Sequence, residues 1–144
     1  MPGYLESYRG CVLARECDIM GHMNIQFYTA CIGHATTTIA GAAGLTPDVI
    51  QTHKRGFAAV EQTSKYYAEL LADDIIHMES AIVASSTKTL TFHHRLFNSA
   101  SGVLSFEATM TSAYMDLEKR KAIPLDHFIL PNLKNLQVDP ETAQ

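Results

Sequence analysis

The sequence predicts an α+β fold in which one antiparallel sheet wraps around a single long helix. The chain has 144 residues, which is the size of one domain. Residues 25–43 contain no Asp, Glu, Lys or Arg and carry apolar side chains at helical spacing. Four later segments alternate apolar and polar residues with a period of two, as strands with one buried face do. The order strand, helix and four strands therefore predicts a five-stranded, mainly antiparallel sheet with the helix on one face.

The first strand and the long helix are separated by a short loop. We expect the strand over residues 8–16, where Val12 and Ala14 alternate with more polar neighbours. Asn24 is a favourable N-cap residue, and Gly44 stands where a helix commonly stops. Because the helix carries no charge on any side, we expect it to be buried all round. Its main apolar stripe consists of Ile25, Tyr28, Ile32, Ala35, Ile39 and Ala42.

A short second helix and four strands make up the rest of the expected structure. Pro47, in a first-turn position, predicts a helix that ends near Lys54. Turn residues at 85–87 and 98–102 favour antiparallel pairing between strands that are consecutive in the chain. The strands are expected over residues 57–69, 75–84, 88–97 and 103–115.

The whole chain, residues 1–144, is expected to form one domain with its core at about 8–128 and a polar, frayed tail at 132–144. Eleven Lys and Arg against fifteen Asp and Glu give a net charge of −4, which argues against binding to nucleic acid. Only 18% of the residues are charged, which suggests that another subunit covers part of the surface. The N-terminus has no secretory pattern and no apolar run is long enough for a membrane span, so we expect a cytoplasmic protein.

The three cysteines, Cys11, Cys17 and Cys31, contain no Cys-x-x-Cys pair. This spacing argues against a zinc ribbon and against a thioredoxin-type redox pair. Adjacent His93 and His94 point to opposite faces of a strand and cannot form a metal site by themselves. We therefore expect reduced thiols, no metal site and no redox cofactor.

The loop before the long helix concentrates groups that could act on a carbonyl. Asp18 is a carboxylate near a helix N-terminus, available as a nucleophile or a general base. Gly21 has no side chain, so a substrate can approach the backbone closely. The first helical amides, near Ile25, lack intrahelical acceptors and lie at the positive end of the helix dipole. Together these groups predict a site for a carbonyl that becomes tetrahedral.

This loop also carries a family resemblance. The segment Asp18-Ile19-Met20-Gly21-His22-Met23-Asn24, followed by Phe27-Tyr28, resembles the signature of hotdog-fold acyl-CoA thioesterases of the 4-hydroxybenzoyl-CoA thioesterase type. The resemblance covers about residues 8–128. Many members have a second Asn where Ile25 stands, but a backbone donor survives that change. The resemblance continues at Gly44-Leu45, in the segment 67–74 and at 122–125.

The resemblance implies the hotdog fold and hydrolysis of an acyl-CoA to a free acid and CoA, with no cofactor beyond the CoA of the substrate. It implies Asp18 as the catalytic carboxylate and the Ile25 N–H as the main oxyanion donor, with Gly21 beside it. One branch of the family carries its acid on the central helix, and the absence of an acid there favours Asp18. The resemblance further implies a homodimer or homotetramer with active sites at subunit boundaries.

Several residues keep two interpretations. Asp18 could serve only as a cap for the helix, and Asn24 is either an N-cap or a substrate ligand. His22 either orders the loop or acts as a base. Glu61 either faces a neighbouring subunit's site or is a solvated strand residue. Lys88 matches a place where relatives carry basic residues against the CoA phosphates, but it is equally a surface lysine.

The acyl group and two rival functions also stay open. Tyr28, Tyr66 and Tyr67 would suit an aromatic acyl group or a quaternary ammonium group. A non-catalytic hotdog domain that binds acyl-CoA would not need Asp18. A hotdog hydratase or dehydratase would need a differently placed His and carboxylate, and the sequence lacks that motif.

Overall fold

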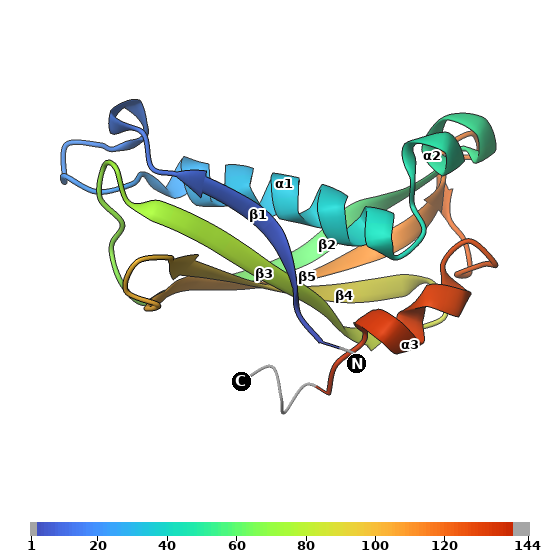
Figure 1. Cartoon of the computed structure of the whole chain (residues 1–144). Helices are drawn as coiled ribbons and strands as arrows, with labels where there is room; N and C mark the ends of the chain where they lie inside the picture. The colour runs from blue at the N-terminus through green and yellow to red at the C-terminus, as the bar shows by residue number, and fades with distance from the viewer. Residues whose placement is uncertain (1–2, 140–144) are drawn as a thin grey trace.

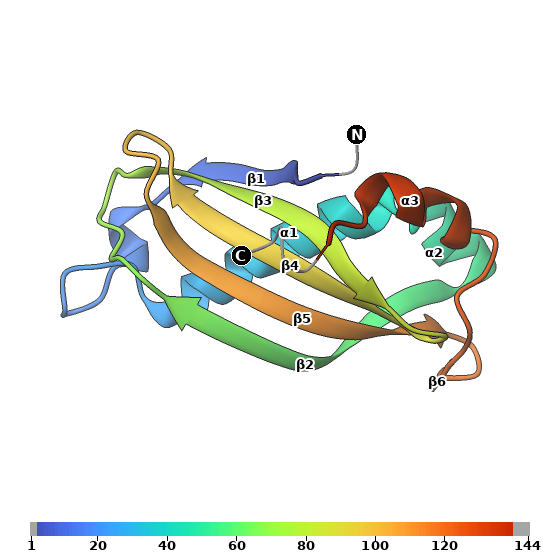
Figure 2. The same cartoon turned by 90° about the horizontal axis from the view of Figure 1, so that it is seen from below.

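A computed structural model describes residues 3–139 and confirms the α+β hotdog arrangement. The sheet has the order β1-β3-β4-β5-β2, every neighbouring pair is antiparallel, and short β6 pairs with β5. Helix α1 lies along one face of this curved sheet (Figure 1), and the other face is seen in Figure 2. The elements are β1 (Leu5–Cys11), α1 (Ile25–Ala42), α2 (Pro47–His53), β2 (Arg55–Tyr66), β3 (Ile75–Ser85), β4 (Thr89–Asn98), β5 (Leu104–Asp116), β6 (Lys121–Ala122) and α3 (Leu133–Leu136), with 3-10 turns at Ala14–Glu16 and Leu130–Asn132.

Helix α1 begins and ends where the sequence predicts. The Asn24 side-chain oxygen accepts the Gln26 N–H at 3.1 Å, so Asn24 is the N-cap. Past the last turn Gly44 has a φ of +119°, which glycine adopts without strain. A Cβ at Gly44 would lie 1.9 Å from the carbonyl oxygen of Phe128. Glycine therefore both stops the helix and lets the C-terminal segment approach it.

Only one side of α1 is buried, so the expectation of burial all round is wrong for this chain. The sheet can cover one face of a helix, and it covers Tyr28, Cys31, Ile32, Ala35, Ile39 and Ala40. The small or uncharged residues Gly33, His34, Thr37 and Thr38 are exposed. No helix within residues 3–139 is long and apolar enough to cross a membrane.

The first strand lies earlier than the expected 8–16. Strand β1 ends at Cys11, and residues 14–16 form a 3-10 turn instead. The Glu16 carboxylate accepts the Leu13 N–H at 2.7 Å, a local bond that competes with continued strand pairing.

The expected pairing of consecutive strands holds for β3, β4 and β5 and fails for β2. Strand β2 pairs with β5 and forms one edge of the sheet, because the long segment 67–74 carries the chain from β2 to β3 on the far side of β4. Each residue from 58 to 63 is exposed along this edge, and Val60 is 63% exposed. A β-bulge lies between Ala59 and Glu61.

In the described part of the tail, residues 132–139, the chain packs against the domain; the rest of the expected frayed tail, residues 140–144, lies outside the described residues. The Asn132 amide donates to the carbonyl oxygens of Ala43 at 2.9 Å and Phe128 at 3.1 Å. Val138 is buried, and its N–H donates to the Ile82 carbonyl at 2.8 Å. Apolar burial and these bonds hold the tail beside α1 and β3.

A polar cluster lies between α1 and the sheet. His94 is fully buried there, with Nδ1 2.6 Å from the Ser80 hydroxyl and Nε2 3.3 Å from the Thr36 hydroxyl. The Ser80 hydroxyl is also 2.6 Å from that of Ser7. Burial is the main cause that lowers the pKa of His94, to about 4, so the ring is neutral at pH 7.

Candidate active site

The loop of residues 17–24 forms a tight, anchored turn before α1. The Gly21 N–H donates to the Asp18 carbonyl at 2.9 Å, and the Asp18 N–H donates to the His22 carbonyl at 3.1 Å. Gly21 has a φ of +85°, which explains why glycine stands there. The Met23 N–H donates to the Leu70 carbonyl at 2.8 Å, which ties this turn to the segment after β2.

The Asp18 carboxylate is held by two donors. Its Oδ2 accepts from the Asn24 Nδ2 at 2.8 Å, and its Oδ1 accepts from the Met20 N–H at 2.9 Å. The Asn24 bond, and then the Met20 bond, lower the pKa of Asp18 below its ordinary value. Asp18 is therefore ionised at neutral pH and held next to the helix N-terminus.

The first turn of α1 presents a free donor beside this carboxylate. Asn24 uses its side-chain oxygen for the Gln26 N–H and its carbonyl for the Phe27 N–H, at 3.1 and 3.0 Å. Within residues 3–139 no hydrogen bond uses the Ile25 N–H. The Gly21 N–H, in contrast, is engaged inside the turn. The Ile25 N–H is thus the better placed of the two expected oxyanion donors.

A cavity of about 370 Å³ opens at this end of α1. Tyr28 on α1 and Tyr66 on β2 meet edge to face in its wall, with ring centroids 5.1 Å apart. Burial raises the pKa of Tyr28 to about 12, so its hydroxyl stays neutral. The lining residues are His22, Met23, Ile25, Tyr28, Tyr66, Tyr67, Ala68 and Glu69.

The structure gathers most of the predicted site residues and leaves two apart. Glu61 and Lys88 are exposed and lie elsewhere on the sheet. Lys88 precedes β4, and its carbonyl accepts the Tyr114 N–H at the end of the sheet opposite the turn that contains Asp18. The residues at or beside the N-terminus of α1 are Asp18, Gly21, His22, Asn24, Ile25, Tyr28 and Tyr66.

The bulge in β2 decides which side chains face α1. Ala59 and Gln62 face the α1 side, because Val60 is the extra residue between them that shifts the alternation. Glu61 therefore points to the opposite face of the sheet. Sequence alternation did not reveal Gln62, whose amide donates to the Ser64 hydroxyl at 3.0 Å on the α1 side. Nor did it reveal Glu69, because that residue lies in a loop beyond the strand.

His22 has its ring Nδ1 3.2 Å from the Met23 carbonyl, a bond within the loop. Among residues 3–139 no group of three or more His, Cys, Asp or Glu side chains is arranged to hold a metal ion.

Comparison with known proteins places this chain in a family. A family model described as the thioesterase-like superfamily matches residues 12–133. Among curated proteins, none matches this sequence.

Solved structures share the fold at low sequence identity. The hypothetical protein SAV2348 from Staphylococcus aureus, solved in complex with CoA, has a TM-score of 0.84 and 15% identity, covering 96% of this chain and 89% of its own. The 1,4-dihydroxy-2-naphthoyl-CoA thioesterase Slr0204 from Synechocystis has a TM-score of 0.76 and 17% identity, covering 93% and 98%. The probable thioesterase YbaW from Escherichia coli has a TM-score of 0.75 and 18% identity, covering 90% and 96%. With the family match over most of its length, this chain belongs to the thioesterase-like superfamily and is a thioester hydrolase of the hotdog fold.

Proposed function

We propose that this protein is an acyl-CoA thioesterase in which Asp18 and the Ile25 N–H act on the thioester carbonyl. The observation that supports this most is an ionised carboxylate bonded to the N-cap residue Asn24, directly before Ile25, whose free N–H lies at the lining of an aromatic cavity. The similar structure from Staphylococcus aureus was solved with CoA, and the one from Synechocystis is named for an aromatic acyl-CoA. Both names are consistent with a CoA thioester as substrate.

The Ile25 N–H would stabilise the negative charge that develops on the carbonyl oxygen. It lies at the N-terminus of an 18-residue helix, where the dipole adds to the hydrogen bond. Removal of one oxyanion donor typically costs about 10²–10³ in kcat, so this contribution is large.

Asp18 has two possible roles, and both balance as hydrolysis. As a nucleophile, its carboxylate oxygen bonds to the carbonyl carbon, the C–S bond breaks, and CoA leaves as a thiolate. Water then cleaves the mixed anhydride and restores Asp18. As a general base, Asp18 takes a proton from the water whose oxygen bonds to the carbonyl carbon, the same C–S bond breaks, and the proton passes to the leaving CoA thiolate, which restores Asp18.

The site residues outside this pair have supporting roles in the proposal. Asn24 holds Asp18 ionised, and His22 orders the loop. Tyr28 and Tyr66 contact the acyl group. Glu61 and Lys88 do not reach Asp18 within their own chain, so we propose that any contact they make with substrate is supplied across a subunit boundary.

A panel of acyl-CoAs tests the proposal most directly. Purified protein is mixed with short, long and aromatic acyl-CoAs, and the release of free CoA thiol is followed. We expect hydrolysis of at least one class and strong loss of that activity in Asp18→Asn. No thiol release from any member of the panel would refute the proposal.

A further inference from the structure

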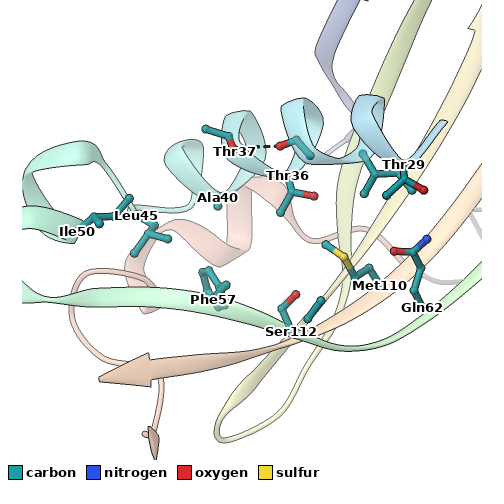
Figure 3. A pocket seen from close by; sticks show the side chains of 13 residues that line it. Thr29, Thr36, Thr37, Ala40, Leu45, Ile50, Phe57, Gln62, Met110 and Ser112 are labelled. Atoms are coloured by element: carbon teal, nitrogen blue, oxygen red, sulfur yellow. Dashed lines mark hydrogen bonds between the residues drawn. The ribbon is translucent and has the colours of Figure 1, made fainter. Parts of the chain in front are cut away.

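Two cavities lie along α1, and they differ in what forms their walls. One, of about 390 Å³, lies between α1 and the sheet, and every residue that lines it except Leu45 belongs to a helix or a strand (Figure 3). In the lining of the cavity at the N-terminus of α1, by contrast, Tyr67, Ala68 and Glu69 follow the end of β2 and form a loop. A loop keeps a site in shape only if bonds of its own hold it.

Few hydrogen bonds hold the loop of residues 67–69. The Tyr67 and Ala68 N–H groups both donate to the Ser105 carbonyl, at 2.9 and 3.3 Å. Within residues 3–139 the loop makes one side-chain hydrogen bond, in which the Tyr67 hydroxyl donates to Glu107 Oε1 at 2.5 Å. Tyr67 is 53% exposed, so packing alone does not fix its ring. The bond to Glu107 therefore determines where the Tyr67 side chain lies.

Glu107 is itself fixed on the face of the sheet opposite α1. It lies on β5 between Phe106 and Ala108, which are both in the core beneath α1, so its side chain points the other way. Its Oε2 lies 2.9 Å from His93 Nε2, and His93 Nδ1 lies 2.7 Å from the Tyr4 hydroxyl. A neutral His93 with its proton on Nε2 satisfies both partners, because it donates to Glu107 and accepts from Tyr4. Each carboxylate oxygen of Glu107 thus has a partner.

Glu107 is a charged acceptor for the Tyr67 hydroxyl. Burial opposes its ionisation, but the bonds from Tyr67 and His93 outweigh burial and lower the pKa of Glu107 below its ordinary value. The exposed Lys65, opposite Glu107 on β2, favours the same charged form. A hydrogen bond to a carboxylate is stronger than one between neutral groups.

The loop that Tyr67 anchors is connected to the turn that contains Asp18. After residue 69 the chain continues to Leu70, which is fully buried and whose carbonyl accepts the Met23 N–H at 2.8 Å. Met23 stands between two residues that hold Asp18. The His22 carbonyl accepts the Asp18 N–H, and the Asn24 side chain donates to the Asp18 carboxylate. A displaced loop would therefore also displace the groups that orient Asp18.

We propose that Glu107 is a positioning residue, which holds Tyr67 from the far face of the sheet and so fixes both the loop wall of the cavity and the turn that contains Asp18. Its carboxylate points away from α1 and touches neither the substrate nor the reacting atoms. The effect of Glu107 on the reaction rate rests on the proposed function, whereas its effect on the loop does not. Small displacements of groups that position a substrate are costly, so the loss of this bond should reduce activity.

The test uses variants on both sides of the bond. Tyr67→Phe removes only a hydroxyl from a half-exposed ring and should keep the fold, Glu107→Ala removes the acceptor, and a double variant combines them. Glu107→Gln keeps an oxygen that can accept from Tyr67. The control is Glu6→Ala, which removes a strand carboxylate whose side-chain partner is Arg9.

Two measurements are made on each variant. The values of kcat and KM are determined by thiol release from butanoyl-, benzoyl- and dodecanoyl-CoA. Hydrogen–deuterium exchange, read by mass spectrometry, follows the peptides that cover residues 17–26 and 66–71. The exchange measurement reports on the loop without substrate, so it does not depend on the proposed function.

We expect Tyr67→Phe and Glu107→Ala each to lower kcat/KM by about three- to tenfold, the usual effect of one lost hydrogen bond. The double variant should lose no more than the larger single loss, because the bond is already absent in each single variant. Glu107→Gln should lose less than Glu107→Ala. In Tyr67→Phe and Glu107→Ala both peptides should exchange at least about threefold faster, and Glu6→Ala should match wild type in both measurements.

Losses that add in the double variant would overturn the proposal, because the Tyr67 hydroxyl would then act independently of Glu107. Unchanged exchange in both peptides would overturn it as well, and so would faster exchange spread evenly over the whole chain, which indicates general destabilisation. No thiol release from wild type with any of the three substrates would refute the proposed function alone. Faster exchange confined to the two peptides would in that case still support the hold of Glu107 on the loop.

Discussion

At the scale of single residues, Asp18 combines a stabilised negative charge with a position close to the N-terminus of α1. Two hydrogen bonds stabilise its charged form, one of them from Asn24. The free N–H belongs to Ile25, the residue directly after Asn24 and the first residue of α1. A carboxylate that only capped the helix would bind helical N–H groups, and here Asn24 does that instead. The division of labour between these two side chains supports a chemical role for Asp18.

Asp18→Asn should abolish most of the activity. The substitution keeps the shape and removes the negative charge, so we expect kcat to fall by at least about 10²-fold with the fold retained. Steady-state thiol release and a thermal melt measure the two effects. Asp48→Asn, on the surface helix α2, is the matched control and should keep wild-type activity. Retention of most activity in Asp18→Asn would remove Asp18 from the mechanism.

Asn24→Asp separates the two functions of Asn24. Aspartate is as good an N-cap as asparagine, so the bond to the Gln26 N–H and the stability of α1 should persist. The donor to Asp18 is lost and a like charge takes its place, which raises the pKa of Asp18. We expect the acid limb of the kcat/KM profile to move to higher pH with little change in Tm. An unchanged pH profile would show that Asn24 does not tune Asp18.

We also predict that the activity does not require a metal ion. The cysteines and histidines lack ligand spacing in the sequence, and the proposed chemistry needs only Asp18 and a backbone donor. Extended dialysis against a chelator should therefore leave the rate of thiol release unchanged. Loss of activity on dialysis, followed by recovery with one particular metal ion, would contradict this prediction.

At the scale of elements, the interface between α1 and the sheet contains a buried titratable group. His94 is neutral in the folded protein, with its pKa lowered from 6.5 to about 4 mainly by burial. A lowered folded-state pKa means that the unfolded chain binds the proton first as the pH falls. The contribution of His94 to stability is therefore complete above pH 6.5 and is lost as the pH falls toward 4.

His94→Phe should weaken the acid dependence of stability. Over the interval from pH 7 to pH 4.5, wild type should lose roughly 2 kcal/mol more unfolding free energy than the variant, from the linkage between folding and protonation. Urea unfolding at both pH values measures this difference. His127→Phe, at an exposed position, serves as the control. Equal acid sensitivity in His94→Phe and wild type would mean that the ring is not held neutral.

The elements also show what the sequence could and could not predict. Local signals located α1 well, because Asn24 and Gly44 act within one turn of the residues they cap. The end of β1 differs from the predicted one because the Glu16 side chain bonds Leu13 and ends the extended segment early. The orientation of Glu61 depends on a bulge, which alternation alone does not reveal. For the same reason Gln62 was not recognised as a residue of the α1 side.

At the scale of the whole molecule, strand β2 leaves one edge of the sheet without a neighbouring strand within the described residues. Six successive residues along it are exposed, although long unprotected edges tend to pair with other chains. The apolar side chains Ile19, Met20 and Ile25 near the candidate site are also exposed, by 102%, 72% and 61%. Low overall charge agrees with a surface that a second subunit covers.

We predict that two chains pair through their β2 edges and complete the site at the boundary. Two-fold pairing of the same strand would place Val60 close to its own counterpart, so Val60→Glu would bring like charges together across the edge. Light scattering at micromolar concentration should give at least a dimeric mass for wild type and a lower mass for Val60→Glu. Activity should fall with the mass, because the cavity at the N-terminus of α1 lies beside the end of β2. Thr52→Glu, an added charge on the exposed surface of α2, should keep both mass and activity. A monomeric wild type with full thioesterase activity would contradict the shared site, since a complete reaction centre would then exist within one chain.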